Sequence, residues 1–197
     1  MNTTVVLIGP MCAGKSSTAK ILAERLGRQY VDLDELRWAY YRELDAYEEL
    51  VALLKSGEIG LLEQYNYWKP FEAHAVERVV PEYPNCVLDF GAGHGVYEDE
   101  ALLARVQQAL STVAHVILLL PAPDVAEATA VLNTRFARLL QEVAGTVNPE
   151  ALQLNEHFVK HPSSRRLASQ IVYTGDQTPE QVCDEIVKRI GGQMPPL

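Results

Sequence analysis

The chain has 197 residues, of which 48% are hydrophobic and 22% charged, and its formal net charge is -9 at pH 7. These values are typical of one soluble globular domain spanning residues 1–197. The acidic balance argues against a nucleic-acid partner, which requires a basic face. No apolar run reaches the roughly 20 residues of a membrane-spanning helix, so we expect no membrane partner.

Short apolar runs alternate with longer helical stretches along the chain, a pattern typical of an α/β protein with a parallel sheet covered by helices. Continuous apolar runs such as VVLI and HVILLL predict strands that are buried on both faces. The predicted strands are 3–8, 29–32, 86–90, 115–120 and 170–174, and the predicted helices are 15–26, 35–55, 71–80, 100–110, 122–143 and 179–190. The stretch 144–169 is the least sheet-like long segment, and we expect part of it to form a mobile lid.

Residues 9–16 read G-P-M-C-A-G-K-S and match the phosphate-binding pattern G-x-x-x-x-G-K-[ST] completely. The motif lies between a predicted strand and a predicted helix, where backbone N–H groups and the helix N-terminus favour bound phosphates. We expect Lys15 to span the β- and γ-phosphates and Ser16 to ligate magnesium. The alternative is a glycine turn that only caps the helix. The predicted nucleotide-binding residues are Gly9, Pro10, Met11, Cys12, Ala13, Gly14, Lys15, Ser16 and Ser17.

Aspartates follow two of the predicted strands at their carboxyl ends, where the functional groups of an open α/β sheet gather. Asp32 and Asp34 come after the second strand, and Asp89 ends the apolar run 86–88. We expect Asp34 to orient the proton of an acceptor hydroxyl, while Asp32 and Asp89 hold magnesium or its waters. The alternative for the pair is that Asp34 caps the next helix and Asp32 is solvated in the turn.

These motifs resemble those of the shikimate kinase family of P-loop small-molecule kinases. The resemblance rests on GPMCAGKSS, VDLDEL, VLDFGAGHG and the C-terminal HPSSRRLASQIVYTGDQTPEQVCDEI. It implies a P-loop NTPase fold, with a five-stranded parallel sheet in the order 2-3-1-4-5 flanked by helices and a helical lid. It also implies an acceptor-binding insert at about 35–82 and a lid at about 135–165.

The same resemblance implies roles for individual residues. Asp34 matches the acidic residue that contacts the acceptor, and Asp32 matches the one near magnesium. Gly91, Ala92 and Gly93 stand at the place of the family's triple-glycine acceptor loop. The family's lid supplies an arginine to the transferred phosphate, and the candidates are Arg135 and Arg138, of which we prefer Arg138. Alternatively, both arginines are solvated on a helix.

The chain departs from the family at the positions that bind the acceptor's carboxylate. The family uses two arginines there, whereas the best local match places Glu72 at the first position and His161 near the second. Because a glutamate repels a carboxylate, we expect an acceptor other than shikimate, with hydroxyl, amino or ring nitrogen groups. His94 either binds substrate or is a loop histidine in water. The aromatic segment around Tyr67 either walls the pocket or packs a helical flap.

The sequence thus predicts an ATP- and Mg2+-dependent phosphotransferase that acts on a hydroxyl of a small molecule. The alternatives are a nucleoside or nucleotide kinase and a non-catalytic ATP-dependent switch. The three widely spaced cysteines have no metal-binding spacing, which predicts reduced thiols and a cytoplasmic protein.

Overall fold

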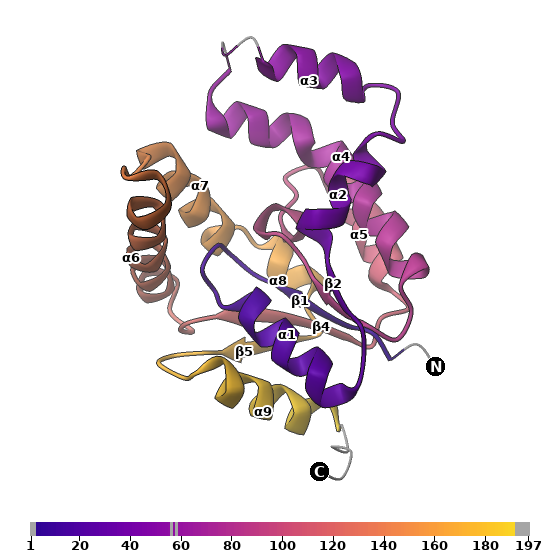
Figure 1. The fold of residues 1–197 in the computed structure, drawn as a ribbon, viewed down its shortest axis with the longest axis vertical. Helices are drawn as coiled ribbons and strands as arrows, with labels where there is room; N and C mark the ends of the chain where they lie inside the picture. The colour runs from indigo at the N-terminus through magenta and orange to yellow at the C-terminus, as the bar shows by residue number, and fades with distance from the viewer. Residues whose placement is uncertain (1–2, 56, 58, 192–197) are drawn as a thin grey trace.

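A five-stranded, all-parallel sheet in the order β2-β3-β1-β4-β5 forms the centre of the molecule, as predicted. The computed structural model describes residues 3–55, 57 and 59–191. The strands, at the centre of Figure 1, are β1 Val5–Ile8, β2 Tyr30–Asp32, β3 Val87–Asp89, β4 His115–Leu120 and β5 Gln170–Tyr173. Strands with apolar residues at every position need cover on both sides, and helices supply it.

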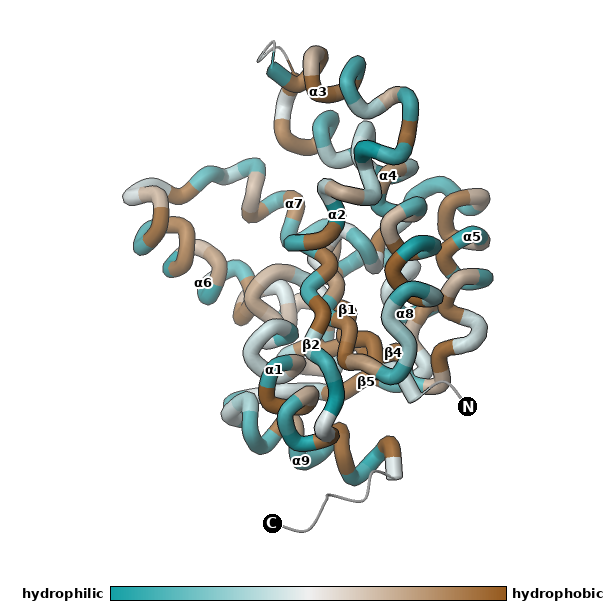
Figure 2. Tube along the Cα trace, turned by 45° about the vertical axis from the view of Figure 1, so that its right-hand side comes forward, coloured by the Kyte–Doolittle hydropathy of each residue, from teal (hydrophilic) through white to brown (hydrophobic). Residues whose placement is uncertain are grey.

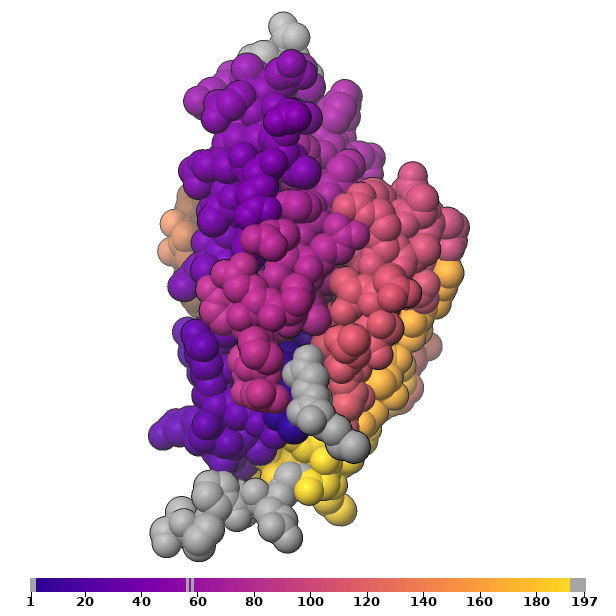
Figure 3. All heavy atoms as spheres, turned by 90° about the vertical axis from the view of Figure 1, so that its right-hand side faces the viewer, coloured from indigo at the N-terminus to yellow at the C-terminus, as the bar shows by residue number. Residues whose placement is uncertain are grey.

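The two faces of the sheet bury two separate clusters of apolar side chains. On β1, Val5 and Leu7 pack toward helices α1 (Lys15–Leu26) and α9 (Pro179–Ile190). The alternate residues, Val6 and Ile8, pack toward α4 (Leu61–Glu82) and α5 (Glu100–Leu110). Figure 2 shows the strands as a hydrophobic centre, and Figure 3 shows α4 and α5 side by side over one side of the molecule.

The segment between β2 and β3 differs from the prediction at its helix boundaries. The predicted helix 35–55 is two helices, α2 (Leu33–Tyr41) and α3 (Tyr47–Lys55), joined by a turn that contains neither Gly nor Pro. The predicted helix 71–80 covers only part of α4, mostly in its second half, and α4 runs through both Pro70 and Pro81. A proline normally ends a helix because it lacks the N–H donor, but apolar packing of α4 on the sheet keeps this helix continuous.

Two helices after β4 stand beside the sheet, at the left of Figure 1. They are α6 (Val125–Ala144) and α7 (Pro149–Lys160), and they pack against each other. The short helix α8 (Ser163–Leu167) then leads into β5. The stretch 144–169 is therefore mostly helical. In the described part of the chain, no helix combines the length and apolar character needed to cross a bilayer.

Candidate active site

The phosphate-binding motif forms the turn between β1 and α1, as its pattern predicts. Gly9 has a φ of 149°, and a Cβ at this position would lie 2.7 Å from the carbonyl oxygen of Leu119 on β4. Gly14 is the N-cap residue of α1, with a φ of 87° and no side chain to block the first N–H groups of the helix. The turn therefore presents open backbone donors, which favour an anion such as a phosphate.

Lys15 is buried at the centre of this turn, where its ammonium group donates to the carbonyl oxygen of Pro10 at 3.0 Å. Burial lowers the pKa of Lys15, and the carboxylates of Asp89 and Asp34 are the strongest opposing influences. The residues predicted to surround the phosphates are therefore close enough to act on one another electrostatically.

Asp32 and Asp89 are neighbours in register on β2 and β3, at the edge of the sheet that faces the P-loop. The Tyr30 hydroxyl lies 3.0 Å from Oδ2 of Asp32 and 3.2 Å from Oδ2 of Asp89. Oδ1 of Asp89 is buried and has no hydrogen-bond partner. Burial raises the pKa of Asp89, while Lys15 and the Ser16 hydroxyl lower it. A buried carboxylate oxygen without a partner beside a hydroxyl fits a divalent cation.

Carboxylates alone do not complete a metal site here. In residues 3–55, 57 and 59–191, no three His, Cys, Asp or Glu side chains are grouped closely enough to hold a metal ion. A magnesium ion at Asp89 would need further oxygen ligands from Ser16, from water and from a nucleotide, as this ion commonly does.

Asp34 lies in the first turn of α2 rather than in an extended segment, and Asp32 is the N-cap residue that accepts from its N–H at 2.9 Å. The alternative prediction, that Asp34 caps the helix, is therefore wrong. Asp34 instead packs against the backbone of Gly91, because a Cβ on Gly91 would overlap its carboxylate. A larger residue at position 91 would displace the Asp34 carboxylate from this place.

A pocket of about 280 Å3 opens between the P-loop, the loop after β3 and three helices. A volume of this order suits a small molecule. The pocket is lined by Met11 of the P-loop, Asp34 and Arg37 of α2, Leu61, Gln64, Tyr65, Trp68 and Glu72 of α4, Ala92 and Gly93 after β3, and Leu154 and Phe158 of α7.

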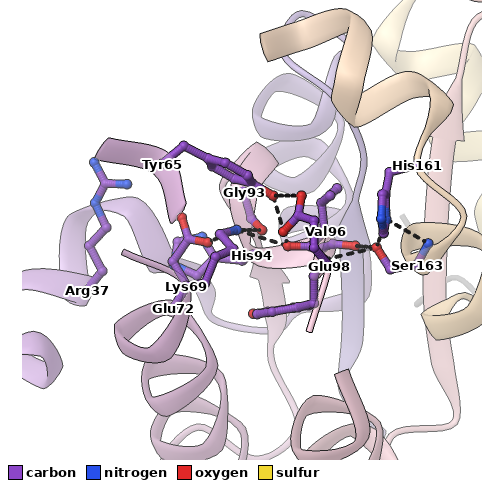
Figure 4. Close-up of polar contacts among 12 residues, drawn as sticks. Arg37, Tyr65, Lys69, Glu72, Gly93, His94, Val96, Glu98, His161 and Ser163 are labelled. Atoms are coloured by element: carbon purple, nitrogen blue, oxygen red, sulfur yellow. Dashed lines mark hydrogen bonds and ion pairs between the residues drawn. The ribbon is translucent and has the colours of Figure 1, made fainter. Parts of the chain in front are cut away.

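Glu72 reaches this pocket as half of a buried ion pair with Lys69 (Figure 4). The Lys69 ammonium also donates to the carbonyl oxygens of Gly93 at 2.8 Å and Val96 at 2.9 Å. It lies 4.0 Å from the centre of the Tyr65 ring. Burial raises the pKa of Glu72 and lowers that of Lys69, and each partner opposes the shift of the other. Lys69 thus ties the base of the pocket to the glycine-containing loop.

His94 is completely buried behind the pocket, in a 3-10 turn formed by residues 92–95. The alternative of a loop histidine in water is therefore wrong. The turn that follows Gly91 carries the side chain inward, toward Tyr41 and Asp34.

Four predicted acceptor contacts do not line the pocket: Gly91, the buried His94, Tyr67 and His161. Tyr67 points outward from α4, is 41% exposed and is paired with Glu63. His161 follows α7 and interacts through Nδ1 with the Ser163 hydroxyl at 2.8 Å. Figure 4 shows it on the far side of Glu98 from Glu72. Helical phase places Tyr65 and Trp68 of the aromatic segment on the pocket side and Tyr67 on the solvent side.

The lid arginines also differ in their placement. Arg135 donates to the carbonyl oxygen of Gly175 at 3.1 Å, and its charge lowers the pKa of the Cys12 thiol against the larger effect of burial. Arg138 is exposed. Arg135 is therefore close enough to the P-loop to act on Cys12 electrostatically, whereas Arg138, the preferred candidate, is exposed to solvent.

The polar residues of the site that were not predicted include Arg37, Lys69 and Asn155. Asn155 of α7 is fully buried, and its Oδ1 accepts from the N–H of Met11 in the P-loop at 2.9 Å. An asparagine within an otherwise amphipathic helix was the only sequence signal. Arg37 lies three residues after Asp34, and this helical spacing could have identified it.

Comparison with known proteins agrees with this geometry. A sequence profile of the family described as shikimate kinase matches residues 11–191. A shikimate kinase of Streptomyces coelicolor is 31% identical over 90% of this chain and 90% of its own length.

Two solved structures share the fold at lower sequence identity. A shikimate kinase from Acinetobacter baumannii in complex with shikimate is 20% identical, with a TM-score of 0.65 over 96% of this chain and 93% of its own. A gluconokinase from Sinorhizobium meliloti 1021 is 16% identical, with a TM-score of 0.56 over 96% and 92% of the two chains. The profile match over residues 11–191 and the relative from Streptomyces coelicolor show that the chain belongs to the shikimate kinase family and is a small-molecule kinase with a hydroxyl acceptor.

Proposed function

We propose that this kinase transfers the γ-phosphate of Mg-ATP to a hydroxyl group of a small polyhydroxylated molecule other than shikimate. The observation that carries the proposal is Glu72, a buried carboxylate in the pocket wall. A carboxylate at this position accepts hydrogen bonds from hydroxyl or amino groups. Even when it is paired with Lys69, Glu72 offers no free positive charge that could bind the carboxylate of an acid. The free thiols of the chain support a cytoplasmic location.

The groups around the P-loop supply what phosphoryl transfer needs. Lys15 neutralises charge on the phosphates, and Asp34 orients the acceptor hydroxyl and accepts its proton. Ser16, Asp32 and Asp89 would hold magnesium, whose chemistry is to neutralise phosphate charge. Arg135 would approach the transferred phosphate when α6 and α7 close as a lid, which also excludes water from the reaction.

The positive charge of Arg37 in the pocket wall favours an anionic acceptor. Its guanidinium lines the pocket but is paired with Asp34, its Nη1 lying 3.1 Å from Oδ1. Pairing with Asp34 reduces the positive charge that Arg37 offers to an acceptor. The curated relatives are named shikimate kinase, so shikimate is the first compound to test.

A panel assay with labelled Mg-ATP tests this proposal. The panel contains shikimate, gluconate, neutral sugars, cyclitols, amino sugars and nucleosides. We expect phosphorylation of a neutral or amino polyol with a kcat/KM at least about tenfold above that for shikimate, equal to about 1.4 kcal/mol of discrimination. Lys15→Ala is the control variant and should abolish transfer. Preferred turnover of shikimate would contradict the acceptor class, and preferred turnover of a nucleoside would favour stacking on Tyr65 and Trp68 as the basis of recognition.

A further inference from the structure

His94 is a fully buried titratable side chain, and it has no role in phosphate binding. Its exposed fraction is 0%, and its Nδ1 atom has no hydrogen-bond partner. Nδ1 lies 4.0 Å from Oδ1 of Asp34, and Nε2 lies 3.5 Å from the Tyr41 hydroxyl. A buried polar atom without a partner is costly, so the orientation of this ring toward Asp34 calls for a physical reason.

One face of α2 lies beside the His94 ring. Asp34, Arg37 and Tyr41 stand at positions i, i+3 and i+7 of that helix, and this spacing places them in one row. Arg37 is paired with Asp34, and its side chain also interacts with the Tyr41 hydroxyl. The side chains that hold Asp34 and His94 thus form a connected polar group: Asp34, Arg37, Tyr41 and His94.

The surroundings of the ring also determine which nitrogen carries the proton. Burial lowers the pKa of His94 well below its ordinary value, and the nearby cations Arg37 and Lys69 act in the same direction. The ring is therefore neutral and has a single N–H group. Burial raises the pKa of Tyr41, so its hydroxyl remains protonated. Because the Arg37 side chain already donates to the Tyr41 oxygen, the Tyr41 O–H is the group that donates to Nε2. The proton then belongs on Nδ1, which faces Asp34.

We propose that His94 is a positioning residue for Asp34: its Nδ1–H donates to the Asp34 carboxylate and fixes the orientation in which that group receives the acceptor's hydroxyl proton. The proposal rests on the role of Asp34 in the proposed function. Unliganded enzymes often hold such contacts slightly too long, and they shorten when substrate binds. In this arrangement the His94 ring limits the movement of the Asp34 carboxylate on one side, and the backbone of Gly91 limits it on another.

The tautomer is testable without knowing the acceptor. Nitrogen-15 spectra of the histidine rings in the full chain, with no added ligand, should show His94 neutral and protonated at Nδ1. Asp34→Asn should move the Nδ1 signal, and Glu35→Gln, an exposed neighbour on α2, should leave it unchanged. A proton on Nε2, or an Nδ1 signal that ignores Asp34→Asn, would overturn the proposal.

A pair of isosteric variants tests the catalytic consequence with Mg-ATP and the panel compound that is turned over fastest. His94→Asn places an amide nitrogen near the Nδ1 position, whereas His94→Gln places one near Nε2. We expect kcat to fall about 10- to 100-fold in His94→Gln and much less in His94→Asn, with the KM for ATP unchanged in both. Equal losses would assign His94 to packing alone. If no panel compound is turned over, the proposed function fails, and the spectra still decide the role of His94.

Discussion

At the scale of single residues, the buried pair Lys69 and Glu72 most distinguishes this pocket. An arginine expected from the family is replaced by a glutamate, and the cation that neutralises it stands one helical turn earlier on α4. Lys69 is almost completely buried and has two carbonyl acceptors besides the glutamate. Such a pair is stable only while both partners are present, because either charge alone would be buried without compensation.

Glu72→Gln should therefore destabilise the fold. We expect the free energy of unfolding, measured by urea denaturation, to fall by about 3 kcal/mol because the Lys69 charge loses its partner. The double variant Lys69→Met/Glu72→Leu removes both charges and should recover most of this loss. A single variant as stable as the parent would show that the pair is not buried as described.

Among single residues, the sequence predicted those that belong to a motif with a fixed spacing along the chain. The P-loop glycines, Lys15 and Ser16 follow such a pattern, and Asp89 follows from an acidic residue at the end of an apolar strand. Lys69 could not be found in the same way, since its importance depends on which way α4 faces. Arg37 could be found only by placing Asp34 on a helix, where Asp34 stands three residues earlier. The same helical phase excluded Tyr67 from the pocket.

At the scale of secondary-structure elements, the strands were predicted well and the helix boundaries less well. Apolar runs identify buried strands because few other structures tolerate them. The order of the strands followed from the resemblance, not from the pattern. The break between α2 and α3 occurs at a turn without Gly or Pro, and α4 continues through Pro70. In both places tertiary packing decided the outcome, and a local pattern does not contain that information.

Helix α7 is attached to the P-loop through Asn155, which also donates to Oδ1 of Asn133 on α6 at 3.3 Å. The attachment links the two helices proposed as the lid to the nucleotide site. Asn155→Leu has a similar volume but leaves the Met11 N–H without an acceptor.

We expect Asn155→Leu to lower the free energy of unfolding by about 1–3 kcal/mol and to weaken ADP binding measured by calorimetry. Asn133→Ala is the matched control, because it removes the second contact of Asn155 while leaving the one to Met11. Its effect on ADP affinity should be smaller. Equal effects of the two substitutions would locate the coupling in the helix pair rather than in the P-loop contact.

At the scale of the whole molecule, three apolar clusters divide the structure. Two cover the faces of the sheet, and a third joins α4 to α7 through Tyr65, Val96, Leu154 and Phe158. This third cluster lies beside the acceptor pocket, and three of its members line it. Filling the nucleotide and acceptor sites therefore affects contacts between distant segments of the chain.

Nucleotide binding should accordingly raise the thermal stability of the entire chain. A ligand at 100 times its Kd adds about 2.7 kcal/mol, which corresponds to an increase in Tm of roughly 5–11 °C for a chain of this length. Mg-ADP should produce such a shift in differential scanning fluorimetry. The shift should shrink when EDTA removes magnesium and nearly vanish in Lys15→Ala. No shift in the parent protein at millimolar Mg-ADP would contradict the nucleotide site.

The Tyr30 hydroxyl restricts which carboxylate oxygens at this edge of the sheet are free to bind a cation. Because its hydroxyl already lies against Oδ2 of both Asp32 and Asp89, the oxygen that Asp89 still offers is Oδ1. A cation that binds Asp89 must therefore reach this one buried oxygen, which has no hydrogen-bond partner. A tyrosine outside the phosphate-binding motif thus selects the side from which the charge of Asp89 can be reached.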